Sequence, residues 1–69
     1  MSPYQNFLKR EIKRINQEII LNKQLTKLLS DSVIRHPANR QRDIAQIIEL
    51  KFFLVELEQE LRLLSLHIF

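Results

Sequence analysis

The second half of the chain carries more apolar surface than one neighbouring helix can cover. One set of apolar residues recurs at alternating spacings of three and four, the heptad pattern of a coiled-coil helix. This set, the seam of the second helix, comprises Ile47, Leu50, Leu54, Leu57, Leu61, Leu64 and Ile68. A second set lies roughly 120–180° around the same helix. This outer stripe comprises Ile48, Phe52, Val55, Leu63 and Leu66. So short a chain can cover only one set, so the other needs a partner.

The chain is one small domain without the usual covalent staples. It has 69 residues, no cysteine, and two histidines that are far apart in sequence. Neither a disulfide nor a metal site is therefore expected. Domains of this size bury a low fraction of their surface and usually need such a staple. Oligomerisation is the remaining route to a sufficient core.

The composition predicts helices and no strands. Glycine is absent, and the two prolines, Pro3 and Pro37, lie where helices can begin. Ser2 and Gln5 predict a capped helix start. The apolar positions that follow have helical spacing; they are Leu8, Ile12, Ile15, Ile19, Leu25, Leu29 and Val33. Asn22 interrupts this stripe, either as a residue that fixes register or, as the pattern slightly favours, as a solvated residue at its edge.

A break near Pro37 predicts two helices that fold back on each other. Proline disfavours helical geometry at the residue before it, so the first helix should end near His36. We expect an all-α, coiled-coil-like antiparallel hairpin over residues 1–69. The first helix should span about 3–33, the turn about 34–37 and the second helix about 38–67. One continuous helix kinked near Pro37 is the alternative, but short connections favour antiparallel neighbours.

The distribution of charge supports the antiparallel arrangement. Residues 1–34 carry six basic and three acidic groups, whereas residues 35–69 carry five of each. Folding the chain back near Arg35 places the basic residues 10–14 alongside residues 57–61, where glutamates gather. An exposed ion pair contributes only ~0–1 kcal/mol, but the agreement of several pairs favours this register. We expect the seam to face the first helix, although the outer stripe could exchange roles with it.

The surplus of apolar surface predicts a small interaction protein that is not an enzyme. We expect the hairpin to complete a four-helix bundle by dimerisation. The contact to itself or to another helical protein should be made largely by Ile48, Phe52, Val55, Leu63 and Leu66. An adaptor, a regulator or a dedicated chaperone would work in this way. The sequence has no nucleophile or cofactor motif, and two long helices offer no enzyme-sized pocket. We therefore expect no cofactor, metal or small-molecule substrate.

A dimeric regulator that binds nucleic acid is the alternative function. The isoelectric point is about 9.7, and Arg35, Arg40 and Arg42 around the turn have only Asp43 close in sequence. These arginines, with the basic residues of the first helix, are candidate anion contacts. The net charge is only +3, which weakens this alternative. No apolar run approaches the ~20 residues that span a bilayer, so we expect a cytoplasmic protein without a membrane partner.

Overall fold

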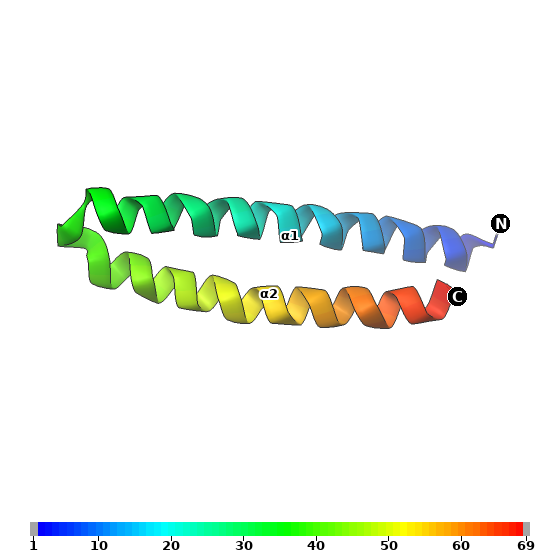
Figure 1. Cartoon of the computed structure of the whole chain (residues 1–69). Coiled ribbons are helices and arrows are strands. Elements are labelled where there is room, and N and C mark those ends of the chain that lie inside the picture. The colour runs from blue at the N-terminus through cyan, green and yellow to red at the C-terminus, as the bar shows by residue number, and fades with distance from the viewer. Residues whose placement is uncertain (1, 69) are drawn as a thin grey trace.

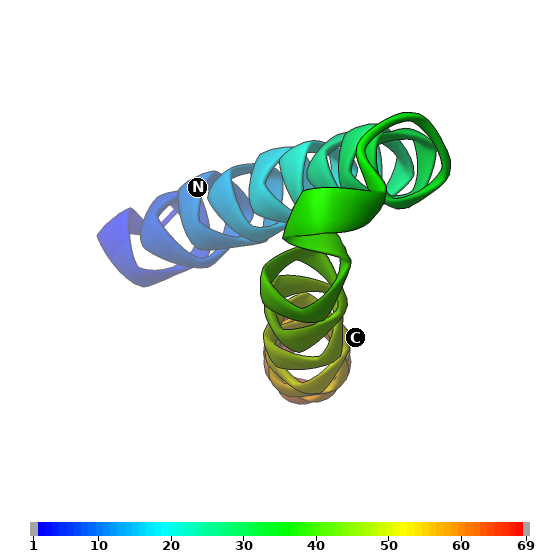
Figure 2. The same cartoon turned by 90° about the vertical axis from the view of Figure 1, so that its left-hand side faces the viewer.

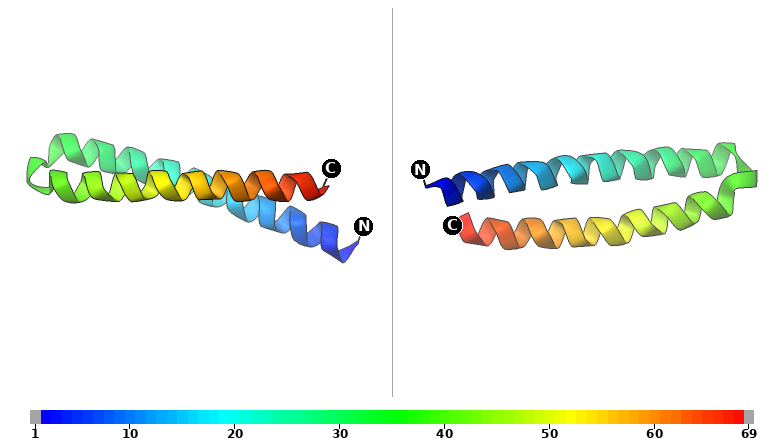
Figure 3. Two further views of the ribbon diagram at one scale, coloured as in Figure 1. Left: turned by 90° about the horizontal axis from the view of Figure 1, so that it is seen from below. Right: turned by 180° about the vertical axis from the view of Figure 1, so that it is seen from behind.

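The computed structural model describes residues 2–68 as two long antiparallel helices (Figure 1). Helix α1 spans Pro3–Arg35, a short 3-10 helix η1 spans Pro37–Asn39, and α2 spans Arg40–Ile68. The two chain ends lie at the same end of the hairpin, called here the open end, and the turn lies at the other (Figures 1 and 3). Viewed along its length, the hairpin is twisted, because the two helices cross (Figure 2). The predicted all-α hairpin is confirmed, and the single kinked helix is wrong.

Local hydrogen bonds close both ends of α1. At the start, the Ser2 hydroxyl accepts a hydrogen bond from the backbone N–H of Gln5 at 3.2 Å, as its capping pattern predicted. At the end, His36 leaves helical geometry at φ −129° and ψ 75°, and its N–H donates to the carbonyl of Ser32 at 2.8 Å. Pro37 favours this extended geometry at the residue before it. The chain therefore reverses without glycine, and without a left-handed residue in the described part.

The helices meet along two heptad seams. The predicted seam of α2 does face α1, because Leu57 is buried and the rest of it is half-buried where its side chains are described. Ile68 was also assigned to this seam, but its side chain lies outside the described part. The matching seam of α1 alternates by fours and threes and is buried or half-buried; it comprises Leu8, Ile12, Ile15, Ile19, Asn22, Thr26, Leu29 and Val33.

For two residues of α1, the predicted burial is wrong. Leu25 was assigned to the seam and Asn22 to its solvated edge, but Leu25 is 49% exposed and Asn22 only 3%. The reason is geometric. The alternation of three and four continues from Ile19 to Asn22 and Thr26, and it passes by Leu25. A regular helix must keep this period, so the packing period outweighs the preference of leucine for burial at this one position.

A hydrogen bond from Asn22 joins the two helices at one level. Its side-chain Nδ2 donates to the backbone carbonyl of Leu50 at 2.8 Å. Because both seams repeat every seven residues, Ile15 and Leu57 lie at one level, a heptad nearer the open end. Both are buried, with 0% and 3% of their surfaces exposed. The hydroxyl of Thr26 donates to the carbonyl of Asn22 at 2.9 Å, which satisfies this polar group inside its own helix.

The buried side chains change character along the hairpin. From the middle of the hairpin to the turn they are polar: Asn22 and Asp43 are buried, and Ser32 donates from its Oγ to Oδ2 of Asp43 at 2.7 Å. Toward the open end the buried side chains are apolar; they are Leu8, Ile15 and Leu57. The fully buried side chains are thus polar toward the turn and apolar toward the open end, while half-buried apolar seam residues pack along both halves.

Candidate interaction surfaces

The outer stripe occupies positions of α2 outside the seam that meets α1. All of its members are exposed, and Phe52 and Leu66 each keep 70% of their surface accessible. Ile48, Phe52 and Val55 border a shallow hollow of about 280 Å³ together with Lys51. The seam already occupies the side of α2 that meets α1. The outer stripe, which comprises Ile48, Phe52, Val55, Leu63 and Leu66, is therefore uncovered by the residues that the structure describes.

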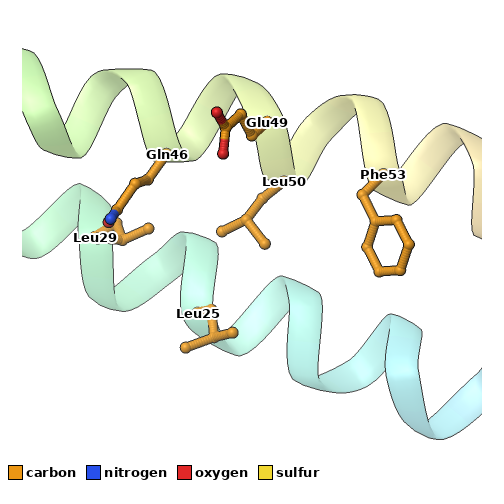
Figure 4. A pocket seen from close by; sticks show the side chains of 6 residues that line it. All are labelled: Leu25, Leu29, Gln46, Glu49, Leu50 and Phe53. Carbon is orange, nitrogen blue, oxygen red and sulfur yellow. The ribbon is translucent and has the colours of Figure 1, made fainter.

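An apolar groove follows one face of the hairpin between the helices (Figure 4). Its volume is about 420 Å³, and the side chains lining it are Leu25, Leu29, Gln46, Glu49, Leu50 and Phe53. A smaller hollow of about 170 Å³ extends the groove toward the open end, where Leu21 and Glu18 join its lining. Leu21, Leu25 and Phe53 are all exposed. Leucine and phenylalanine side chains from both helices therefore form one accessible apolar surface.

A charged network borders this groove on its open-end side. Arg14 contacts Glu11 at 2.8 Å and Glu18 at 2.7 Å within α1, and its Nη2 lies 3.7 Å from Oε1 of Glu60 on α2. The hydrogen bond and the attraction of Glu11, followed by those of Glu18, raise the pKa of Arg14 above its ordinary value. The contact with Glu60 confirms the prediction that residues 10–14 lie alongside residues 57–61. Lys13, however, forms no ion pair with any residue that the structure describes.

The two broad faces of the hairpin differ in charge. In an antiparallel pair, residues that flank the two seams on the same side share one face. The groove face, which contains the groove and Arg14, carries Glu11, Glu18, Glu49, Glu56 and Glu60. Among the described residues, the opposite face, called here the lysine face, has one acid, Glu58; its basic residues include Lys13, Lys23, Lys27, Lys51 and Arg62. The chain therefore separates charges of opposite sign across its thickness.

The turn arginines do not join the lysine face. Arg35, Arg40 and Arg42 are exposed at the turn end. Arg35 follows the groove residue Leu21 by two heptads, and Arg42 precedes Glu49 by one heptad. Both therefore project on the side of the groove face. Arg35 and Arg42 therefore lie on the opposite face from most lysines of α1, so a single flat ligand cannot contact both these arginines and the lysines.

Binding of apolar groups is the chemistry that these surfaces offer. Over residues 2–68, no group of three or more His, Cys, Asp or Glu side chains is arranged to hold a metal ion. In the same part of the chain, neither helix combines the length and apolar character needed to cross a membrane. Comparisons of the chain with protein families, with curated proteins and with solved structures find no match.

The groove between the helices was not among the surfaces predicted from the sequence. One signal for it was present, because Leu21, Leu25 and Leu28 are spaced by four and three and form a short stripe of their own. The stripe lies beside the seam of α1, so it is uncovered once the seam is packed. Its partner in the groove, Phe53, belongs to neither apolar set of α2, and only the folded hairpin brings the two together.

Proposed function

We propose that the protein is a non-enzymatic helical interaction module that pairs into a four-helix bundle and binds another helical protein on the outer stripe of α2. An adaptor, a regulator or a dedicated chaperone acts in this manner. The observation that carries the proposal is the exposure of every outer-stripe residue, led by Phe52 at 70%. Monomeric soluble proteins rarely expose contiguous apolar patches larger than roughly a few hundred Å² unless the patch binds something.

The small core of the hairpin supports the same proposal. The described apolar side chains that are fully buried are Leu8, Ile15 and Leu57. Burial of apolar side chains is the main contribution that opposes the conformational entropy lost on folding. The half-buried seam residues add to the burial of these three side chains. Covering the outer stripe would bury more large apolar side chains than the hairpin encloses alone, so a bound partner should stabilise the fold strongly.

The spacing in the outer stripe suits recognition of one helix by another. Ile48, Phe52 and Val55 follow one another at intervals of four and three, so they form a continuous ridge on one side of α2. Phe52 is the largest of the three and the most exposed. It is the anchor that we expect to enter a groove of the partner, because buried aromatic side chains dominate most interface energies.

Site-specific photocrosslinking in cells tests this proposal. A photoreactive amino acid replaces Phe52 in one variant and Gln24, an exposed residue on α1, in the control. We expect a discrete adduct with a helical protein at position 52 and none at position 24. The purified partner should then bind the wild-type chain, and Phe52→Asp should abolish this binding while circular dichroism stays unchanged. The same adducts at both positions, or an unchanged affinity of Phe52→Asp, would contradict the proposal.

Binding of nucleic acid by the lysine face is a second candidate function. Its support is the gathering of Lys23, Lys27 and Lys51 on one side of the hairpin, where Glu58 is the one acid among the described residues. Phosphate contacts make such affinity strongly salt-dependent: 6–10 contacts lose roughly 10³–10⁵-fold between 50 and 200 mM salt. Fluorescence anisotropy with labelled duplex DNA and RNA measures this. No binding at low salt, or binding unaffected by Lys23→Glu combined with Lys27→Glu, excludes the candidate.

A further inference from the structure

Charge changes sign along the groove face. The glutamates surrounding Arg14 lie between the groove and the open end. The apolar groove around Leu25 occupies the middle, and Arg35 and Arg42 follow near the turn. The face is therefore negative on one side of the groove and positive on the other. A surface with this order of charges is complementary to itself when it is turned end for end.

We propose that a second copy of this chain binds the groove face in an antiparallel orientation, about a two-fold axis that crosses the groove between Leu21 and Leu25. This inference rests on the self-association in the proposed function and deepens it by naming the face and the register. The two-fold places α1 on α1 and α2 on α2. Leu25 of each copy then contacts Leu21 of the other, and the exposed groove leucines of both copies become the centre of the interface.

The same axis brings opposite charges together on α1. Arg35 lies ten residues beyond Leu25, and Glu11 lies ten residues before Leu21. A two-fold axis midway between the two leucines therefore sets Arg35 of each copy opposite Glu11 of the other. The same two-fold axis therefore produces both the contact between leucines and the contact between Arg35 and Glu11.

An equivalent match arises independently on α2. The bond between Asn22 and the carbonyl of Leu50 sets these residues at one level, so the axis passes close to Glu49. Arg42 and Glu56 lie seven residues to either side of Glu49. Each Arg42 is thus set opposite Glu56 of the other copy. Glu49 instead approaches its own equivalent, which makes it the one unfavourable residue near the axis.

Other symmetric arrangements pair like charges. A two-fold axis through the lysine face at the same level sets lysines against lysines. An axis that runs along the groove face places α1 on α2 at equal levels, so that Glu11 of one copy meets Glu60 of the other. Like-charge contacts of this kind disfavour a partner by several kcal/mol. The antiparallel arrangement on the groove face is the one that joins apolar contact with opposite charges.

The two copies share most of the groove face. The proposed axis lies about 21 Å from the turn at ~1.5 Å per residue, so the copies overlap over about 42 Å of the 53 Å length of the hairpin. With a width of 14 Å, the shared backbone footprint is about 590 Å², against ~800 Å² per partner in standard interfaces. Side chains enlarge this footprint further. The groove supplies an apolar centre and the ionic residues supply a polar rim, as in known interfaces. The outer stripe of α2 stays accessible to a different partner in this dimer.

The solution mass of the purified chain, measured by sedimentation equilibrium over a range of concentrations, tests the proposed face. The wild-type chain should be a dimer. Leu25→Glu should raise the dimer dissociation constant on the order of 30-fold or more, as for a central interface residue. Phe52→Glu, the same kind of change on the outer stripe, should leave the dissociation constant unchanged. Both sites are exposed, so circular dichroism should show folded helices in both variants.

Charge reversal tests the register. Arg42→Glu and Glu56→Arg should each weaken the dimer, whereas the double variant should regain the wild-type dissociation constant. Glu49→Gln should tighten the dimer, because it removes the repulsion at the axis. A double variant that is no tighter than either single variant, or a Glu49→Gln dimer that is weaker than wild type, overturns the proposed register.

The outcomes separate this inference from the proposed function. If Leu25→Glu remains dimeric and Phe52→Glu becomes monomeric, the copies associate through the outer stripe, and docking on the groove face is overturned while self-association stands. A wild-type chain that is monomeric at every concentration overturns both claims of self-association. The crosslinking experiment at position 52 still decides the binding of a different protein.

Discussion

Asn22 places a carboxamide in the middle of the seam between the helices. Its Nδ2 binds the carbonyl of Leu50, but its buried Oδ1 has no partner among the described residues. A buried polar atom without a hydrogen bond lowers stability. A single asparagine in a heptad seam can nevertheless select one alignment of the helices. We therefore expect Asn22 to favour one register at the expense of stability.

Replacing Asn22 with leucine should stabilise the hairpin. Asn22→Leu removes the unpaired oxygen and adds apolar contact, and the Leu50 carbonyl keeps its bond within α2. We expect the free energy of unfolding to rise by about 1–2 kcal/mol. Urea denaturation at one fixed protein concentration measures the change. Asn16→Leu, at an exposed position of α1, is the control and should have little effect; a lower midpoint for Asn22→Leu would contradict this interpretation.

The sequence predicted the helical period of α1, but it did not predict which individual residues face the other helix. Leu25 was placed inside because leucine is usually buried, and Asn22 outside because asparagine is usually solvated. Each packed residue, however, follows the common period of the seam. Whether Asn22 finds a hydrogen-bond partner depends on a backbone carbonyl of the other helix, and that neighbour is set only by folding.

Helix α2 has two apolar sides, and the structure shows which of them packs. Periodicity in a sequence gives the angle between the two sets, but not the direction in which either points. The heptad seam was expected to face α1, and it does, with Leu57 at its most enclosed point. The seam is not uniformly buried, since Leu54 is half-buried. The contribution of each leucine should therefore depend on its place along the hairpin.

Truncation of Leu57 should destabilise the fold more than truncation of Leu54. Leu57→Ala removes a side chain that is only 3% exposed, for which we expect a loss of ~2–5 kcal/mol. Leu54→Ala should cost less, because part of that side chain already contacts water. Thermal and chemical denaturation give both values. Equal losses for the two variants would show that the seam is more evenly packed than the structure indicates.

The tie between Ser32 and Asp43 should stabilise the turn end of both helices. Asp43 is buried in the first turn of α2, where the helix dipole also stabilises a carboxylate. Ser32→Ala removes its 2.7 Å hydrogen bond and should cost about 1–2 kcal/mol. Ser30→Ala is the matched control, because Ser30 donates only within α1. In a double-mutant cycle, Ser32→Ala should have little further effect once Asp43→Ala is present.

Over the whole molecule, the two proposed binding surfaces occupy different parts of the hairpin. The outer stripe lies on α2 outside its seam, whereas the groove face is built from both helices. The outer stripe could be predicted because all its residues belong to one helix. The groove could not, because Leu25 and Phe53 approach each other only when the chain folds back.

Separate surfaces should allow two partners to be bound at once. Leu25→Glu should disrupt the pairing of two copies without removing a partner from the outer stripe, and Phe52→Asp should do the reverse. Light scattering on mixtures of the chain with its purified partner measures both. Loss of both interactions in either variant would show that the surfaces are coupled.

The fully buried side chains are polar toward the turn and apolar toward the open end, and this order affects how easily each part of the hairpin opens. Contacts near the turn close a short loop and lose little chain entropy, whereas contacts near the open end close a much longer loop. The apolar packing of Leu8, Ile15 and Leu57 lies where this entropic cost is greatest. Apolar packing and the entropic cost of closing the chain both increase toward the open end, so they offset each other. Amide hydrogen exchange should therefore be slow and nearly uniform over most of both helices, with fraying confined to their last turns.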